Sequence, residues 1–407
     1  MFSRPRPFDI VHVSSAHPWT DNRIHTRAAA TAARAGYRTA LVAVVATRGE
    51  RPDVDWDAPD EQTGVWVRRL PRRRRAARLL VSTVQAVRAA LSSRARVVHL
   101  HDPELVWAIP VLRLARRRVV YDAHEDLPVQ VAGKEYLGHL RGAAARVAHT
   151  VVALARHADV VVAATPSVAR RFPADRTTVV RNLPVLRATD ALLADPSDRP
   201  PVAVYLGAMS HDRGLDVISA VAASPGLPSG WCLRTAGPID GAVDRRAFDA
   251  LCSSGRIDHS GVLPPDRARD LLQGARVGLL PLLPTPAYAQ SIPTKLFEYL
   301  AAGLAVIATD IPSWRELLAG VDCVTWVPAG DPDAVVSALQ RYAGRPDLLD
   351  AHARAGRAAV AEHFRWEREA PELLRVYRQL FGAAPSDGVR PFTRRDLDDS
   401  NRNVVYK

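Results

Sequence analysis

The stretch Gln290-Ser-Ile-Pro-Thr-Lys-Leu-Phe-Glu-Tyr-Leu-Ala-Ala-Gly303 runs directly into Leu-Ala-Val-Ile-Ala-Thr-Asp310. It predicts a loop, a short helix and a buried strand, because Pro293 suits the first turn of a helix and Gly303 suits its end. At about 100° per residue, such a helix has an apolar face and an opposite face. The apolar face holds Leu296, Phe297, Leu300 and Ala301, and the opposite face holds Lys295, Glu298 and Ala302.

Lys295 and Glu298 are therefore expected just inside the start of this helix, where backbone N–H groups favour an anion. A cation and a carboxylate in this place suit a phosphate beside hydroxyl groups, as in a sugar nucleotide. The alternative is an exposed Lys–Glu pair on an ordinary amphipathic helix. The segment by itself favours neither interpretation.

Strand-like and helix-like segments alternate through both halves of the 407-residue chain. The expected strands read as continuously apolar, which favours parallel sheets covered on both faces. In the first half they span 9–14, 39–45, 97–100, 119–122, 160–164 and 178–181, and in the second half 202–206, 232–236, 277–282 and 324–327.

A polar, proline-rich stretch at 190–201 separates the two halves. The alternation predicts an α/β protein with two doubly wound, Rossmann-like domains that face each other across a cleft. Residues 1–190 and 199–365 would form these domains. A last helix at 366–382 is expected to pack back on the first domain, ahead of a loosely ordered polar tail at 383–407.

The net charge of +12 is concentrated in the first half of the chain. Residues 1–190 carry 31 of the 55 Lys and Arg residues but only 17 of the 43 Asp and Glu residues. Contact with anionic lipid head groups is one interpretation, and a solvated face is another. Nucleic acid is not expected as a partner, because no aromatic-basic platform accompanies the charge. The excess centres on Arg68, Arg69, Arg72, Arg73, Arg74, Arg75 and Arg78, which open a segment expected to form an amphipathic helix.

Three widely spaced cysteines, Cys232, Cys252 and Cys323, predict free thiols in a reducing cytosol. No apolar run approaches about 18 residues, so no transmembrane helix is expected, and the first residues do not read as a secretory signal. No Cys/His cluster has the spacing of a metal site.

Six short blocks of sequence carry glycine, basic and histidine residues in a characteristic order. They are His17-Pro-Trp-Thr-Asp-Asn-Arg-Ile24, Tyr121-Asp-Ala-His-Glu-Asp-Leu-Pro128, Val204-Tyr-Leu-Gly-Ala-Met-Ser-His-Asp-Arg-Gly-Leu-Asp216, Ile257-Asp-His-Ser-Gly-Val-Leu-Pro-Pro265, the opening segment and Ile311-Pro-Ser-Trp-Arg-Glu316. Together they resemble the GT-B glycosyltransferases, specifically the large retaining group called family 4. The resemblance covers about residues 8–382.

The resemblance implies a donor-binding set in the second half. Gly207 would let the backbone approach the ligand, and Arg213 and Lys295 would stabilise the leaving diphosphate. Glu298 matches the glutamate that accepts hydrogen bonds from the nucleotide ribose. This chain departs from the family motif in four places of the donor loop. Gln290 replaces the first motif glutamate, and Ser291, Ile292 and Pro293 stand where the family has glycine, an aromatic residue and glycine.

On the acceptor side, the resemblance implies a catalytic or sugar-binding role for His124, beside Arg213 and Lys295 as the other catalytic residues. The alternative is that His124 orients its own loop through Asp122 or Glu125. Further residues expected to line the acceptor site or the cleft are Asp21, Arg23, His101 and Asp102. Asn182 matches a family residue near the domain junction and is expected to be structural.

The implied reaction is retaining transfer of a hexosyl or N-acetylhexosaminyl group from a nucleoside-diphosphate sugar to a hydroxyl acceptor. That acceptor would be a glycan, a lipid-linked glycan or a small molecule, and neither a metal nor another cofactor is expected. The alternatives are a sugar-nucleotide 2-epimerase and a silent nucleotide-sugar-binding subunit. A cytoplasmic enzyme that contacts the inner face of the plasma membrane is expected.

Overall fold

A computed structural model describes residues 7–47, 49–56, 58–132, 141–187, 190, 193–240 and 245–382. The described chain forms two compact units. Leu183–Arg365 makes unit 2, and the segments on either side of it make unit 1. The change of unit comes before the expected stretch 190–201, because Arg181 and Asn182 are held by Glu369 and Arg27 of unit 1. The expected tail at 383–407 lies outside the described residues.

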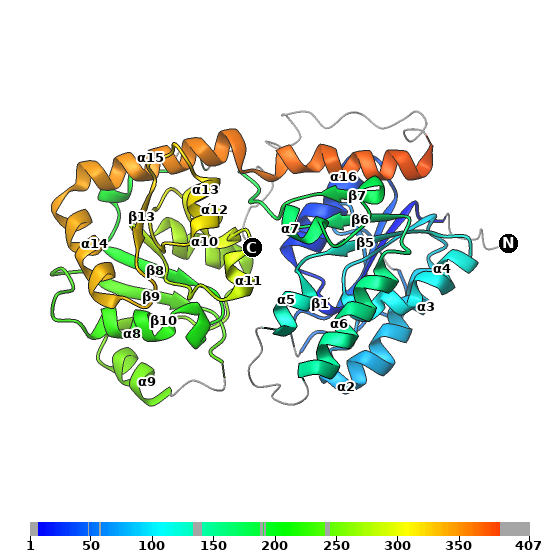
Figure 1. Cartoon of the computed structure of the whole chain (residues 1–407), viewed down its shortest axis with the longest axis horizontal. Coiled ribbons are helices and arrows are strands. Elements are labelled where there is room, and N and C mark those ends of the chain that lie inside the picture. The colour runs from blue at the N-terminus through cyan, green and yellow to red at the C-terminus, as the bar shows by residue number, and fades with distance from the viewer. Residues whose placement is uncertain are drawn as a thin grey trace. The chain divides into compact units, whose positions relative to one another are not determined.

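Unit 1 is built on a seven-stranded parallel sheet with the order β3-β2-β1-β4-β5-β6-β7 (Figure 1). The order reverses between β1 and β4, and loops at the carboxyl ends of such strands form the binding crevice of doubly wound sheets. The strands are β1 (Ile10–Pro18), β2 (Thr39–Val44), β3 (Trp66–Leu70), β4 (Val97–Leu100), β5 (Arg118–Ala123), β6 (Val160–Ala163) and β7 (Thr177–Val179).

Helical segments cover both faces of this sheet, with α16 along one side and α2, α3, α4 and α6 along the other (Figure 1). The longer ones run continuously through two or three named pieces. They are η1 (Asn22–Ala29) with α1 (Ala30–Arg34), α2 (Arg75–Ala77) with η2 (Arg78–Ser82) and α3 (Thr83–Ser92), and η3 (Pro103–Ala108) with α4 (Ile109–Leu114). The others are α5 (Leu127–Ala132), α6 (Arg141–Ala155), α7 (Pro166–Ala169), η5 (Ala174–Arg176) and α16 (Trp366–Phe381).

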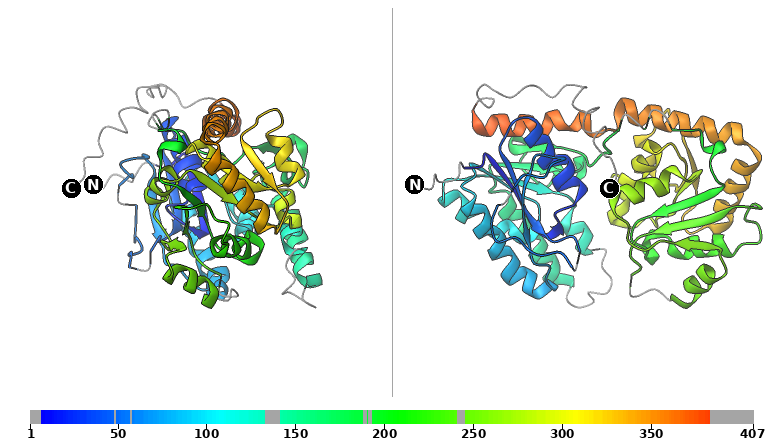
Figure 2. Two further views of the ribbon diagram at one scale, coloured as in Figure 1. Left: turned by 90° about the vertical axis from the view of Figure 1, so that its left-hand side faces the viewer. Right: turned by 180° about the vertical axis from the view of Figure 1, so that it is seen from behind.

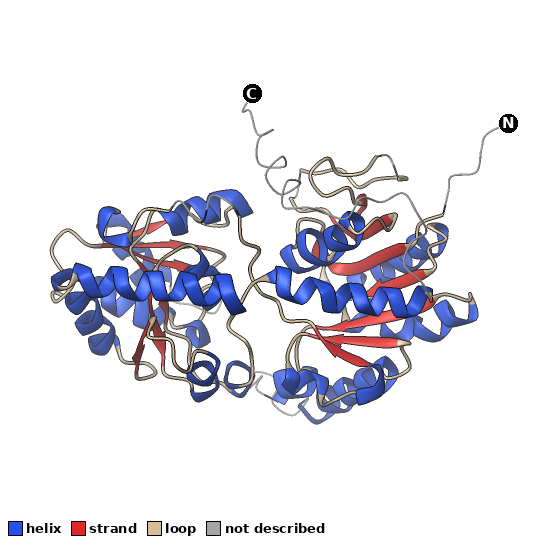
Figure 3. Ribbon diagram, turned by 90° about the horizontal axis from the view of Figure 1, so that it is seen from above, coloured by secondary structure: helices blue, strands red, loops and turns tan. Residues whose placement is uncertain are grey.

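Unit 2 repeats the plan with a six-stranded parallel sheet of order β10-β9-β8-β11-β12-β13, whose order reverses between β8 and β11. Helices flank this sheet as well (Figures 2 and 3). The strands are β8 (Val202–Leu206), β9 (Cys232–Ala236), β10 (Ile257–His259), β11 (Val277–Leu280), β12 (Ala305–Thr309) and β13 (Val324–Val327). The helical segments are η7 (Pro196–Asp198), η8 (His211–Arg213), α8 (Leu215–Ala223), α9 (Arg245–Ser253), α10 (Pro265–Gln273), α11 (Pro286–Ala289), α12 (Thr294–Ala301), α13 (Pro312–Leu317), α14 (Pro332–Gly344) and α15 (Pro346–His363).

The opening segment of the sequence forms the loop, helix and strand expected of it. Pro293 precedes the first helical residue of α12, and Gly303 follows its end with φ +71°. The four apolar-face residues of α12 are all buried. Ala302 differs from the expectation, because it caps the helix and is buried at 4% exposure.

The expected basic helix begins later than its arginines suggested. Arg68 and Arg69 lie on β3, an edge strand that the sequence prediction missed. Arg69 forms ion pairs there with Glu50 and Asp53. The helical segment that starts at Arg75 carries only Arg75 and Arg78 of the cluster, and Arg72, Arg73 and Arg74 lie in the loop before it. Among the helices described within residues 7–382, none is both long and apolar enough to cross a membrane.

Candidate functional site

In unit 2, the turns at the carboxyl ends of β8 and β9 contain glycines, Gly207 and Gly237. Gly207 follows β8 with φ +143°, and a Cβ built there would lie only 2.2 Å from Cε of Lys295. Gly237 follows β9 with φ +139°, and a Cβ there would lie 2.0 Å from the Gly207 carbonyl oxygen. The bare turns therefore let the Lys295 side chain lie directly against the backbone at the end of β8.

Arg213 and Lys295 bring two positive charges to this crevice. Arg213 ends η8, and its Nε donates a hydrogen bond to the Tyr288 hydroxyl at 3.1 Å. Burial and then the charge of Arg213 lower the pKa of Lys295, while Glu298 acts in the opposite direction. Folding thus places the Lys295 ammonium where its charged form is disfavoured. A bound anion would stabilise that charged form and raise the pKa again.

The loop after α11 is fixed by α13, so its backbone has little freedom. The Trp314 indole Nε1 donates to the Ser291 carbonyl at 3.1 Å, and the Ser313 hydroxyl donates to the Ala289 carbonyl at 2.7 Å. Gln290 is exposed on this loop, and Ser291 and Ile292 are half-buried. The loop that carries the departures from the family motif is therefore an anchored part of the crevice.

Tyr299 is a residue of this site that the sequence did not single out. Its buried hydroxyl accepts the Leu206 backbone N–H at 2.8 Å, which ties α12 to the end of β8. Its ring covers Gly278, where a Cβ would lie 2.4 Å from the Tyr299 Cδ2 atom. The pairing of a strand glycine with a helix tyrosine holds Lys295 and Glu298 at their place beside Gly207.

In unit 1, the ends of β1 and β4 meet around the buried carboxylate of Asp102. Asp102 accepts hydrogen bonds from the Ser15 N–H at 2.5 Å, from the Ser14 hydroxyl at 3.0 Å and from His17 Nδ1 at 2.8 Å. Burial by itself would lower the pKa of His17, but the hydrogen bond and charge of Asp102 outweigh it and raise that pKa to about 9. Burial would raise the pKa of Asp102, but the hydrogen bond and charge of His17 outweigh it and lower that pKa to about 2. His17 belongs to a quoted block, yet the sequence did not single it out.

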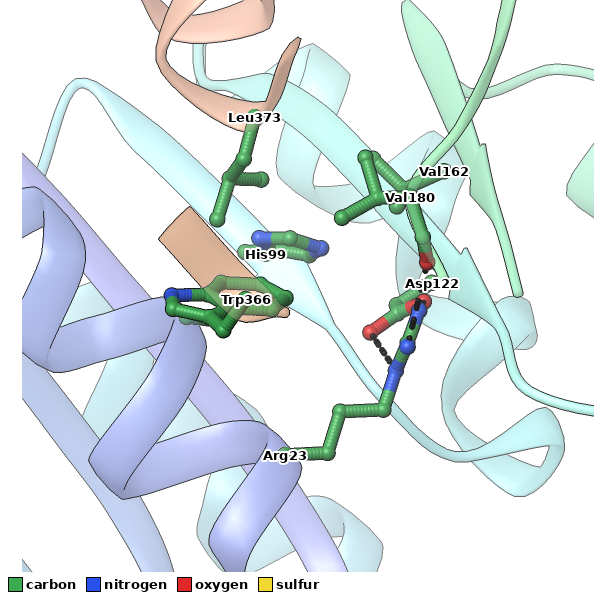
Figure 4. Close-up of a pocket in the computed structure, with 8 residues that line it drawn as sticks. Arg23, His99, Asp122, Val162, Val180, Trp366 and Leu373 are labelled. Atoms are coloured by element: carbon green, nitrogen blue, oxygen red, sulfur yellow. Dashed lines mark hydrogen bonds and ion pairs between the residues drawn. The ribbon is translucent and has the colours of Figure 1, made fainter. Parts of the chain in front are cut away.

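The second buried carboxylate of unit 1, Asp122, forms an ion pair with Arg23 (Figure 4). The Arg23 Nε lies 3.0 Å from Oδ2, and its Nη2 lies 2.6 Å from Oδ1. His101 Nδ1 and His124 Nε2 each lie 3.1 Å from Oδ2. Although burial would raise the pKa of Asp122, the charge of Arg23 and the histidine contacts hold it well below its usual range.

These contacts revise the expected acceptor-side residues. Arg23 is 6% exposed and bound to Asp122, so it does not offer its charge to a ligand. The carboxylate of Asp21 caps η1 by accepting the N–H groups of Arg23 and Ile24. His101 and Asp102 are each 1% exposed and hold their neighbours in place. His124 remains half-buried, with Asp122 as its partner.

Within the part of the chain that the structure describes, two groups of side chains lie close enough together to hold a metal ion. One is His12 with His99 and His101, and the other is His101 with Asp122 and His124. The fold assembles both from separate strands, which spacing in the sequence did not reveal. Asp53 and Asp55 form an Asp-Val-Asp triplet, but Arg69 Nη2 donates to Asp53 Oδ1 at 2.6 Å.

Comparisons with known proteins place both units in one class of protein. Residues 22–183 match the model of the glycosyl transferase 4-like domain, and residues 218–375 match a model described as glycosyl transferase-like. The phosphatidyl-myo-inositol mannosyltransferase of Mycobacterium leprae is 28% identical over 126 residues, or 31% of each chain. The lipopolysaccharide core mannosyltransferase LpsB of Rhizobium meliloti is 25% identical over 254 residues, 56% of this chain and 67% of that protein. The chain thus spans about a third of the mycobacterial relative.

Solved structures show the same fold over most of the chain. Sucrose-phosphate synthase from Thermosynechococcus elongatus is 20% identical, covers 92% of this chain and 99% of its own, and has a TM-score of 0.69. Anabaena HepE in complex with UDP and glucose is 14% identical, covers 90% of this chain and 98% of its own, and has a TM-score of 0.65. WaaG, a glycosyltransferase of lipopolysaccharide biosynthesis, is 14% identical, covers 92% and 100%, and has a TM-score of 0.61.

Proposed function

The chain belongs to the family 4-like GT-B glycosyltransferases, and on that premise we propose that it moves a sugar from a nucleoside-diphosphate sugar to a hydroxyl acceptor. The observation that carries the proposal is the Lys295 side chain against the bare turn at Gly207, with Arg213 at the end of η8 as the second cation. Burial and then the charge of Arg213 lower the pKa of Lys295, which favours an anionic ligand at this point. HepE, with UDP and glucose bound, shares this fold. A nucleoside diphosphate suits both the charge and the neighbouring Glu298.

We propose that the transfer is retaining and takes place on one face of the sugar. The bond between the anomeric carbon and the diphosphate oxygen breaks, while the acceptor oxygen bonds to that carbon. The acceptor proton passes to the leaving diphosphate. Arg213 and Lys295 would stabilise the charge that develops on the diphosphate, and Glu298 would hold the ribose hydroxyls. His124 would hydrogen-bond a sugar or acceptor hydroxyl.

An exposed apolar surface of unit 1 supports a membrane-associated acceptor. It contains Leu79, Leu80 and Val81 on η2 and Trp107, Val111 and Leu114 along η3 and α4. Trp107, Val111 and Leu114 are spaced so that they share one helical face. The ion pair of Arg78 Nε with Glu104 Oε1, at 2.8 Å, joins η2 to η3. Because this ion pair holds the two segments together, their exposed apolar side chains could contact a bilayer at the same time.

Exposed arginines lie next to this surface at Arg72, Arg74, Arg75, Arg113 and Arg116. Apolar side chains bordered by arginine suit an interface with anionic lipid. We therefore propose that the enzyme works at the cytoplasmic face of a membrane on a lipid-linked or glycan acceptor. The named relatives that act on phosphatidylinositol and lipopolysaccharide support the same acceptor class.

Sedimentation with vesicles tests the membrane proposal. Leu80→Glu is expected to reduce binding to vesicles of anionic lipid, and neutralising Arg72, Arg74 and Arg75 is expected to do the same. Val262→Glu is the matched control, because Val262 is an exposed apolar residue of unit 2. Equal binding by all these variants would remove the support for a lipid-facing surface.

Incubation with a panel of radiolabelled nucleotide sugars and a membrane extract tests the proposed reaction. Transfer of label to lipid or glycan supports the glycosyltransferase. Appearance of an isomerised nucleotide sugar would support the 2-epimerase instead. Binding of the nucleotide sugar without either product would support a silent binding subunit. Gln290 favours this alternative, because it lacks the negative charge of the glutamate that the family has at this position.

A further inference from the structure

A buried row of histidines connects the C-terminal helix α16 to His124. Side chains alternate between the two faces of a strand, so His12 on β1, His99 on β4 and His101 directly after β4 lie on the same face. Asp122 on β5 shares that face, while the intervening apolar residues pack into the core on the other side. The three histidines and Tyr377 are at most 1% exposed. Polar groups this deeply buried require partners.

The side chains form one continuous series of hydrogen-bonding contacts. The Tyr377 hydroxyl lies 2.8 Å from His99 Nδ1 and 3.3 Å from His12 Nε2. His12 Nδ1 lies 2.9 Å from His101 Nε2. His101 Nδ1 and His124 Nε2 then both lie 3.1 Å from Asp122 Oδ2.

Only one direction of donation satisfies this series. Burial lowers the pKa of each of the three histidines, so they are neutral, and Asp122 is ionised and can only accept. His101 must then donate from Nδ1, which leaves its Nε2 to accept from His12 Nδ1. His12 Nε2 in turn accepts the Tyr377 O–H. The oxygen of Tyr377 accepts from His99 Nδ1.

The start of the series is His99 Nε2, an acceptor that has no partner among the described residues. His99 lines a cavity of about 10 Å³ together with Arg23, Asp122 and Trp366 (Figure 4). A cavity of this size and polarity suits one water molecule, which would donate to His99 Nε2. A water molecule there would supply the last donor of the series, whose direction of donation is set by Asp122.

The ring geometry of His12, His99 and His101 does not favour a metal ion in place of hydrogen bonds. His99 and His101 stack at 4.5 Å with an interplanar angle of 23°, and His12 and His101 stack at 5.2 Å and 17°. Stacked rings direct their nitrogen lone pairs along parallel planes, whereas a tetrahedral ion requires them to converge.

We propose that Asp122 fixes His124 as the Nε2–H tautomer, which leaves Nδ1 to accept a substrate hydroxyl, and that Tyr377 is a positioning residue whose contacts with His99 and His12 hold the rings of this series, and with them Asp122, in place. The hydroxyl of Tyr377 is the one group in the series that both accepts from His99 and donates to His12. Without it, His12 Nε2 loses its donor and His99 Nδ1 loses its acceptor, while Asp122 still fixes the direction in which His101 donates. The substrate role of His124 rests on the proposed glycosyltransferase function, but the direction of the hydrogen bonds does not.

Nitrogen NMR of the protein labelled with ¹⁵N-histidine tests the tautomers directly. His12, His99 and His101 are expected as Nδ1–H forms and His124 as the Nε2–H form. In Tyr377→Phe, His99 is expected to show mixed tautomers because its Nδ1–H loses its acceptor, whereas His12 should still donate from Nδ1 to His101. An Nε2–H form at any of the three buried histidines in the unaltered protein would overturn the proposal. So would bound zinc found by metal analysis at one ion per chain.

Tyr37→Phe is the matched control, because Tyr37 is buried beside Tyr377 and its hydroxyl has no partner among the described residues. Tyr377→Phe is expected to lower kcat/KM for the acceptor by roughly three- to tenfold, as small misplacements do, with nucleotide affinity unchanged. Tyr37→Phe should change neither value. Equal activities of the two variants would refute the positioning role. The NMR measurement of the tautomers does not depend on any activity. If the proposed function is wrong, the activity measurements will fail while the tautomers can still be as expected.

Discussion

The polar residues at the crevices of the two units are arranged in opposite ways. In unit 1, the buried charges are paired inside the protein, as Arg23 with Asp122 and His17 with Asp102. In unit 2, Arg213 and Lys295 are crowded together, and the pKa of Lys295 is lowered. The first arrangement fixes geometry without a ligand, and the second becomes favourable only when an anion binds.

This contrast implies different consequences of substitution. A change in the unit 1 pairs leaves a buried charge without its partner and should reduce stability. A change in the unit 2 cations should reduce ligand binding while the free protein keeps or gains stability. Stability and activity therefore distinguish the two crevices.

The largest expected loss of stability is that of Arg23→Met, since Arg23 and Asp122 have side-chain exposures of 7% and 2%. Removal of one partner of a buried ion pair costs roughly 3–5 kcal/mol. Urea unfolding measures this loss. The double variant Arg23→Met/Asp122→Leu should recover much of it, because both charges are then absent. A loss of less than about 0.5 kcal/mol in the single variant would contradict the pairing.

Lys295→Met should lower turnover at least tenfold, on the order of the effect of removing one group that stabilises transition-state charge. Arg213→Met should act similarly. The pKa of Lys295 is lower in the folded than in the unfolded chain, so its charge opposes folding below the folded pKa, and this effect fades as pH rises through that value. The Tm of unliganded Lys295→Met should thus stay constant or rise.

Arg345→Met is the control for these variants, because Arg345 forms an exposed ion pair with Asp347 elsewhere in unit 2. Its turnover should equal that of the unaltered enzyme. Unaltered turnover in both Lys295→Met and Arg213→Met would eliminate the diphosphate assignment.

Gly207→Ala should weaken nucleotide binding by roughly tenfold, because its Cβ would displace Lys295 and strain a positive φ. Calorimetric titration with a nucleoside diphosphate measures the change. Gly230→Ala is a matched control, since Gly230 also has a positive φ of +78° but has no atom within 4 Å of an added Cβ. An equal effect of both substitutions would indicate backbone strain and no role for the Gly207–Lys295 contact.

The smallest effect is expected from the pH dependence of the His17–Asp102 pair. The pKa of His17 rises from 6.5 to about 9 on folding, so the pair stabilises the fold fully below pH 6.5 and loses this effect as pH rises through 9. His17→Asn should lower Tm by on the order of a degree or two at pH 6, because the pair is partly screened by solvent. The difference should vanish near pH 10. A difference that stays constant from pH 6 to pH 10 would contradict a charged pair.

Local patterns predicted the parts of the fold that depend on neighbours in the sequence. The apolar spacing of α12 placed Leu296 and Phe297 in the core, and the apolar runs located most strands within a residue or two. β3 was missed because it is an edge strand whose Arg68 and Arg69 read as part of a basic helix. Charged residues are common on edge strands, so composition there misleads.

The polar network of unit 1 could not be predicted from spacing. His12 and Tyr377 are 365 positions apart, and only the sheet order and the return of α16 bring them together. A weaker signal was present, since His99 on β4 and His101 directly after it occupy alternate positions and should share a face. The same network explains why Arg23 is unavailable to a ligand, although its sequence position suggested otherwise.

The most direct test of the central claim is calorimetric titration of the purified protein with UDP, GDP, ADP and TDP, and with the matching monophosphates. At least one diphosphate should bind more tightly than its monophosphate. Its affinity should fall at least tenfold in Lys295→Met, with no change in His17→Asn. Equal affinity for diphosphate and monophosphate, or an unchanged affinity in Lys295→Met, would contradict the assignment of the unit 2 crevice to the diphosphate of a sugar nucleotide.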